Sequence, residues 1–276
     1  MNKKYELTTE TKTIEDGSGN DITLHRIQAL RDFNDVKKGD LGGWVEDESN
    51  LSQEGNCWVY DNAAVYLNGK VGGDAIISDN AKTLQSSSVS GYAKVCDNAM
   101  VSTSSHVSDH ATISGIVVIY DSSIINGYAT IQDSAIVKKS HVTGNSKLFD
   151  SAAVHNGAFI SGTTMLKSNA WVDGYVTLSG NDVLGYNAYI IDMYDDSHNT
   201  DIITIYHTPY KTTRITFYRT ECGIRLIASD SHDKIPEFQG TLQEFKKSIC
   251  KTYRRGNSVR RKLLRTLKYV EKTLQR

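Results

Sequence analysis

An aliphatic residue recurs at every sixth position from Val59 to Ile190, and this period constrains the fold more than any other feature of the chain. Of the 23 positions in the series, 22 are Val, Ile or Leu, and the exception is Thr83. One residue is missing between Val137 and Val142, after which the period resumes. A helix repeats every 3.6 residues and a simple strand every two. A period of six therefore predicts a solenoid of stacked β-coils.

A second period of 18 residues indicates the shape of each coil. Every third repeat carries Asp or Gly two positions after its aliphatic residue, in two separate columns. The columns are Asp61, Asp79, Asp97, Gly115, Asp133, Asp150 and Ser168, and Gly73, Gly91, Asp109, Gly127, Gly144, Gly162 and Gly180. Gly tolerates positive φ, and Asp hydrogen-bonds nearby backbone, so both residues suit corners. We therefore predict seven to eight three-sided coils.

The solenoid divides the chain into three predicted parts. Residues 1–48 form an N-terminal β cap with strands around Asp16–Asn20, and residues 49–192 form the β-helix. Residues 193–276 form a C-terminal α+β module of short strands, a helix introduced by the capping box Thr241–Glu244, and a basic terminal helix. The predicted fold class is mainly β.

The uninterrupted pattern of aliphatic and small residues resembles the hexapeptide-repeat family, whose fold is a left-handed parallel β-helix. The lead-in GDLGGWV at residues 39–45 further resembles uncharacterised β-helix proteins of bacteria, phages and prophages. The resemblance implies the fold and suggests a phage context, and it brings no assigned reaction.

Bulk composition constrains partners and compartment. The formal net charge is only −1, yet residues 246–276 contain twelve Lys or Arg and one acid, Glu271. The chain has no apolar run long enough for a membrane span and no apolar leader at its N-terminus. Its four cysteines show no paired spacing. We predict a cytoplasmic protein with reduced thiols, no membrane partner and no cofactor.

Catalytic and metal-binding interpretations rest on histidines in the repeat. Many hexapeptide-repeat proteins are acyltransferases, and His106 and His141 are the candidate bases if this chain is one. However, these enzymes generally have a long loop that projects from the coils, and no long insertion interrupts the repeat here. His106 and His141 should lie two coils apart on one face, about 10 Å from each other, which is too far to share one ion. We predict no metal site, and acyl transfer remains the alternative function.

One face of the predicted prism is unusually apolar. Its outward positions from the third coil onward are apolar on successive coils. They include Met100, Val118, Ile136, Trp171 and Tyr189. Exposed apolar patches of this length usually mark interfaces. We predict that this face forms a homo-oligomer, and the competing interpretation is that the C-terminal module covers it.

The basic C-terminal segment gives the main functional prediction. Its candidate partner-binding residues are Arg254, Arg255, Arg260, Arg261, Arg265, Lys268 and Lys272. Rows of cations neutralise phosphates, although a solvated helix with surplus charge is also common. The sequence favours a non-enzymatic, phage-type binding protein that engages a nucleic acid or a nucleic-acid-binding host complex, such as a host defence complex that it would inhibit. A structural or virion-associated β-helix protein is a further alternative.

Overall fold

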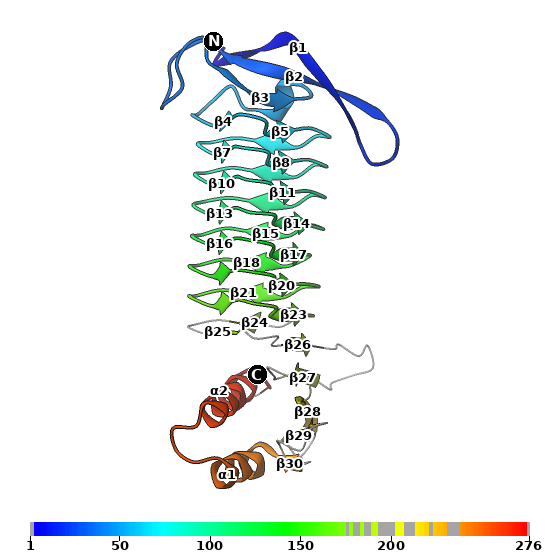
Figure 1. Ribbon diagram of the computed structural model, residues 1–276, viewed down its shortest axis with the longest axis vertical. Helices are drawn as coiled ribbons and strands as arrows, with labels where there is room; N and C mark the ends of the chain where they lie inside the picture. The colour runs from blue at the N-terminus through cyan, green and yellow to red at the C-terminus, as the bar shows by residue number, and fades with distance from the viewer. Residues whose placement is uncertain are drawn as a thin grey trace.

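The computed structural model describes residues 3–174, 177–178, 183–184, 189–192, 202–206, 213–220, 223–230 and 238–274. Its central feature is a parallel β-solenoid of about seven coils (Figure 1). Each coil contributes one short strand to each of three sheets. The predicted mainly β, three-sided solenoid is therefore confirmed.

Two of the three sheets consist only of solenoid strands. The eight-stranded sheet contains β4 (Trp58–Val59), β7 (Ile76–Ile77), β10 (Lys94–Val95), β13 (Thr112–Ile113), β16 (Thr130–Ile131), β19 (Lys147–Leu148), β22 (Met165–Leu166) and β25 (Val183–Leu184). The seven-stranded sheet contains β6 (Lys70–Val71), β9 (Ser88–Val89), β12 (His106–Val107), β15 (Ile124–Ile125), β18 (His141–Val142), β21 (Phe159–Ile160) and β24 (Thr177–Leu178).

The third sheet has 15 described strands and continues beyond the solenoid at both of its ends. It begins with β1 (Tyr5–Glu15), β2 (Asp21–Ala29) and β3 (Leu41–Val45). Its solenoid strands are β5 (Ala64–Val65), β8 (Lys82–Thr83), β11 (Met100–Val101), β14 (Val118–Tyr120), β17 (Ile136–Lys138), β20 (Ala153–Val154), β23 (Trp171–Asp173) and β26 (Tyr189–Asp192). It ends with the antiparallel strands β27 (Ile202–Tyr206), β28 (Thr213–Thr220), β29 (Gly223–Asp230) and β30 (Phe238–Thr241).

Among the described residues there are three helical elements: the 3₁₀ turn η1 (Glu48–Asn50), α1 (Leu242–Thr252) and α2 (Ser258–Leu274). The predicted capping box is present, because the Thr241 hydroxyl accepts a hydrogen bond from the Glu244 N–H and the Glu244 carboxylate accepts one from the Thr241 N–H. The two α-helices bury one apolar face each, formed by Phe245 and Ile249 on α1 and by Leu263 and Leu267 on α2.

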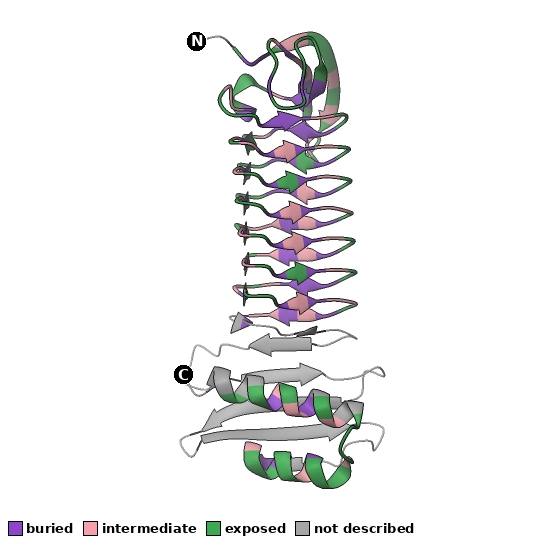
Figure 2. Ribbon diagram, turned by 90° about the vertical axis from the view of Figure 1, so that its left-hand side faces the viewer, coloured by how far each residue is buried: buried purple, intermediate pink, exposed green. Residues whose placement is uncertain are grey.

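The solenoid core follows directly from the six-residue period. In the solenoid strands from β4 to β24, the second residue points inward and is buried, while the first is exposed or half-buried in most coils (Figure 2). The small residue two positions earlier fills the inner side of each corner and is also buried, as at Ala75 and Ala93. At Ser87 the hydroxyl lies within hydrogen-bond distance of two carbonyls, with Oγ 2.6 Å from the Leu84 oxygen and 2.9 Å from the Val101 oxygen.

The predicted corners adopt the left-handed backbone conformation. Asp79 has φ 59° and Gly91 has φ 66°, and the other members of the two columns up to Ser168 are similar. At the third corner two consecutive residues are left-handed, as at Asp121 and Ser122. In the next coil only one residue of this corner, Lys139, has the left-handed conformation. The residue missing after Val137 therefore corresponds to a shorter corner.

The boundaries predicted at residues 48 and 192 stay predictions. Hydrogen bonding in the 15-stranded sheet continues across both positions, from β3 to β5 and from β26 to β27. Among the residues that the structure describes, no helix is both long and apolar enough to cross a membrane.

Candidate functional site

The two candidate histidines lie in the seven-stranded sheet. His106 pairs with Ile124 on the next strand, and Ile124 pairs with His141 on the strand after that. The expectation that they share a face two coils apart is confirmed. A full strand separates the two rings, so they do not form one site.

His141 has a polar partner on one side and an apolar side chain on the other. Its Nε2 lies 3.2 Å from the amide oxygen of Asn126. The ring of Phe159 packs edge-on against it, with centroids 4.9 Å apart and planes at 89°. Because a carbonyl oxygen only accepts hydrogen bonds, the tautomer that makes this contact is the one protonated at Nε2, and in that tautomer Nδ1 keeps its lone pair.

The surroundings of His141 keep the imidazole neutral. The ring is half-buried, and this desolvation lowers the pKa of His141 below its usual value. Its neighbours along the sheet, Ile124 and Phe159, are partly exposed apolar side chains. His141 is therefore a neutral imidazole with a free ring nitrogen, flanked by apolar surface that a substrate can contact.

The other histidines of the coils lack this combination. His106 is exposed, and its Nδ1 is 2.7 Å from the Ser88 hydroxyl. The His110 ring is stacked between the rings of Tyr92 and Tyr128, with ring centroids 4.9 and 4.7 Å apart. His155 stacks on Trp171, and its Nε2 is buried without a hydrogen-bond partner. Of these residues, His141 fits the role of a general base best.

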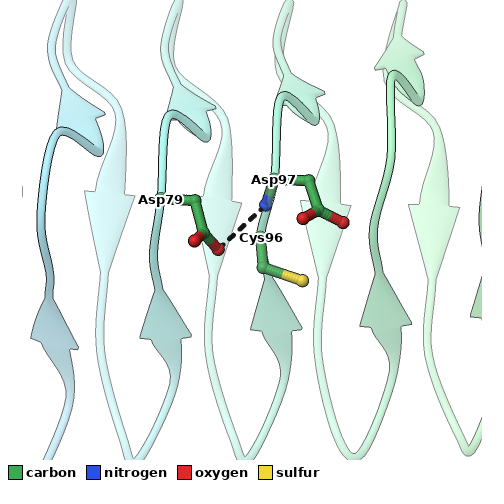
Figure 3. Close-up of side chains that lie close together, drawn as sticks. All are labelled: Asp79, Cys96 and Asp97. Atoms are coloured by element: carbon green, nitrogen blue, oxygen red, sulfur yellow. Dashed lines mark hydrogen bonds between the residues drawn. The ribbon is translucent and has the colours of Figure 1, made fainter.

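Figure 3 shows a group that could hold a metal, formed by Asp79, Cys96 and Asp97 at one corner of successive coils. The Asp79 carboxylate already accepts the N–H of Asp97 at 3.1 Å. The Asp97 carboxylate accepts the N–H of Gly115 at 2.8 Å, and the Cys96 thiol donates to the Ile113 carbonyl. These bonds give the side chains a structural role between coils, and the group carries no independent sign of an ion.

The predicted oligomer face is a continuous column on the 15-stranded sheet. Met100, Val118 and Ile136 pair in register on successive strands, and Trp171 follows two strands later. All four are half-buried. Met100 also packs against the cluster that Trp44 on β3 forms with Ile22 and Leu24 of the N-terminal hairpin. The side chain of Tyr189 lies outside the described residues, and the predicted interface itself stays a prediction.

The basic residues at the C-terminus are distributed around α2 and the turn before it. Arg254, Arg255, Arg261, Arg265 and Lys268 are exposed. Arg260 instead donates hydrogen bonds to the Tyr253 carbonyl and to the Cys250 sulfur. The side chain of Lys272 lies outside the described residues. Cys57, Cys96 and Cys250 are free cysteines, and Cys222 is not described.

No family model matches the chain. A curated relative is similar over part of its length: the "Uncharacterized acetyltransferase YdcK" of Escherichia coli (strain K12), with 44% identity over 72 residues. The matched segment is 25% of this chain and 22% of the relative, so this chain spans about a fifth of that protein.

This similarity corrects the main functional prediction. The expected non-enzymatic, phage-type protein that binds nucleic acid or inhibits a host complex is wrong, because a solenoid with an acetyltransferase relative fits the acyltransferase alternative better. The charge of α2 misled the prediction. An amphipathic helix with buried Leu263 and Leu267 exposes its Lys and Arg to solvent without any need for a phosphate partner.

Proposed function

We propose that this protein is an acyltransferase of the hexapeptide-repeat type that moves an acetyl group from a thioester to an amine or hydroxyl. The arrangement of His141 carries the proposal, because it supplies a neutral imidazole with a free Nδ1 on a solenoid face. The partial similarity to a protein named as an acetyltransferase supports the choice of acetyl group.

In the proposed reaction, His141 Nδ1 accepts the proton of the acceptor nucleophile as that atom attacks the thioester carbonyl. The bond between the carbonyl carbon and sulfur then breaks, and the leaving thiolate takes the proton from the imidazolium. Asn126 holds the ring by accepting a hydrogen bond from the Nε2–H, which stabilises the imidazolium as it forms. Ile124 and Phe159 offer contact area to an apolar part of the acceptor or donor.

The experiment is a thiol-release assay with acetyl-coenzyme A and a panel of primary amines and sugar or nucleoside hydroxyls. His141→Ala should lower kcat/KM by about 10²–10⁴-fold, the usual contribution of a general base. Asn126→Ala should cause a smaller loss, since it positions the ring without touching the substrate. The control is Lys147→Ala, an exposed position on the eight-stranded sheet, which should leave activity unchanged.

Two results would overturn the proposal. If acetyl-coenzyme A neither binds in calorimetry nor releases thiol with any acceptor, the protein is not a transferase of this class. If thiol release is equal in the wild type and in His141→Ala, the assignment of the base is wrong.

A further inference from the structure

A cleft of about 380 Å³ separates the N-terminal hairpin from the first coils of the solenoid. In Figure 1 the β1–β2 hairpin extends down beside β5 and β8. The hairpin side of the cleft is formed by Lys12, Ile14, Glu15 and Leu24, and the solenoid side by Asn62, Ala64, Tyr66, Asn80 and Lys82. The volume is within the range of small-molecule sites.

Two lysines face this cleft from opposite walls without a counter-ion. Neither Lys12 nor Lys82 has a carboxylate within 4.0 Å among the described residues, and Glu15, the acidic side chain in the lining, pairs with neither. Lys12 Nζ lies over the Trp44 ring, 4.4 Å from its centroid. Burial, together with the charges of Lys82 and Arg26, lowers the pKa of Lys12. Like charges brought together in this way disfavour each other unless an anion joins them.

The remaining polar groups of the cleft can supply neutral hydrogen bonds. Asn62 and Asn80 stand one coil apart on the solenoid wall. Among the described residues the side-chain amide of Asn62 has no hydrogen-bond partner, while that of Asn80 donates one hydrogen bond to Asn98 and keeps a second N–H. Trp44 is not part of the lining, but it packs with the lining residues Leu24, Ala64 and Tyr66 and carries the Lys12 ammonium on its ring, so its indole signal reports on the cleft. Two unpaired cations, amide donors and an apolar wall together suit a ligand with a compact, highly charged anionic group and a small apolar body.

We propose that this cleft binds the phosphate group of a small phosphorylated molecule between Lys12 and Lys82. Lysine acts as a point charge that suits phosphate, and the two amides can donate to further phosphate oxygens. Ile14, which is half-buried on the hairpin wall, contacts the apolar remainder of the ligand. The cleft is on the 15-stranded sheet, whereas His141 is on the seven-stranded sheet, so this site does not depend on the proposed acetyl transfer.

Inorganic pyrophosphate serves as the probe, titrated into the full-length protein at low salt. Binding is followed by calorimetry and by the indole N–H signals in an ¹H–¹⁵N spectrum. The chain has three tryptophans, so the Trp44 signal is assigned by its disappearance in Trp44→Phe. Pyrophosphate should bind and shift the Trp44 signal, and the double variant Lys12→Gln, Lys82→Gln should weaken binding by about tenfold or more.

The matched control is Lys70→Gln, an exposed lysine on the seven-stranded sheet, which should bind pyrophosphate as the wild type does. Equal affinity in the double variant, or a Trp44 signal that does not respond, would overturn the site. Acetate at the same ionic strength tests the ligand class: if it binds as tightly as pyrophosphate, the preference for phosphate is refuted.

Discussion

The ammonium of Lys4 lies 2.9 Å from the carbonyl oxygen of Cys57 and 3.2 Å from its sulfur, in a site closed to solvent. It also approaches the carbonyls of Glu54 and Gly55 at 3.3 and 3.5 Å. Burial lowers the pKa of Lys4, and the contact with Cys57 opposes that shift. One side chain immediately before β1 therefore hydrogen-bonds several carbonyls at the end of the first coil.

Replacing Lys4 by an apolar residue should destabilise the protein. Lys4→Met keeps most of the side-chain volume but leaves the carbonyls of Glu54 and Cys57 without their donor. We expect a loss of about 2–4 kcal/mol in the free energy of unfolding, measured by urea denaturation. The adjacent Lys3→Met is the control, because its ion pair with Glu48 is exposed and should contribute less than about 1 kcal/mol. Equal losses in the two variants would refute the role of Lys4.

Thr83 is the one non-aliphatic residue in the series, and its side chain places a polar group in the core that a substitution can remove. Its side chain points into the core, and its hydroxyl is buried without a hydrogen-bond partner. Thr83→Val preserves the side-chain shape and removes the unsatisfied hydroxyl. The free energy of unfolding should therefore rise by about 1–2 kcal/mol. A matched substitution at a satisfied hydroxyl, Ser87→Ala, should destabilise instead. A drop in the urea midpoint of Thr83→Val would contradict this account.

The solenoid could be predicted because its signals repeat. Each inward residue, each small residue beside it and each corner is specified many times, so one exception such as Thr83 does not obscure the pattern. The sequence correctly predicts that these aspartates lie at corners, but it does not predict the partners of their hydrogen bonds. Asp79, for example, accepts the N–H of Asp97 in the next coil, rather than a backbone group nearby in the sequence.

The candidate site was only half predictable. The period shows that His141 points outward, but not that its ring meets Asn126, because that contact depends on the rotamers of two side chains in neighbouring coils. The cleft at Lys12 and Lys82 depends on how the hairpin packs around Trp44, and nothing in the repeat encodes that contact. Non-repeating tertiary contacts of this kind leave no periodic signal.

The pH dependence of the proposed reaction follows from the environment of His141. Burial disfavours the charged ring, so the residue is neutral at pH 7, and kcat/KM should fall only on acidification below the usual histidine pKa of about 6.5. Phe159→Ser admits water to the ring and should move the acidic limb of the profile to higher pH. Met165→Ser, half-buried on the eight-stranded sheet, is the control. An acidic limb that stays in place in Phe159→Ser would argue against desolvation as the cause.

The glycine corners should not tolerate a larger residue where the backbones of two coils approach closely. Gly127 has φ 66°, and a Cβ there would lie 2.8 Å from the backbone nitrogen of Gly144. Gly127→Ala should therefore cost about 1–3 kcal/mol of stability. Gly72→Ala is a matched control, because its backbone is not left-handed and the nearest atom, Ser52 Cβ, is 4.0 Å away. Similar unfolding midpoints for the two variants would show that the corner has room to adapt.

The apolar column on the 15-stranded sheet gives a prediction about assembly. Val118 and Ile136 are paired in register and half-buried, and each points away from the core. If the column is the contact surface between copies, Val118→Glu with Ile136→Glu places charges opposite apolar surface and should convert an oligomer to monomers. The measurement is the molar mass by light scattering after size exclusion. Thr112→Glu with Thr130→Glu, paired in the same way on the eight-stranded sheet, is the control and should keep the wild-type mass. An unchanged mass in the first variant would assign the column to some other role, because charges at its centre cannot be accommodated in an apolar interface.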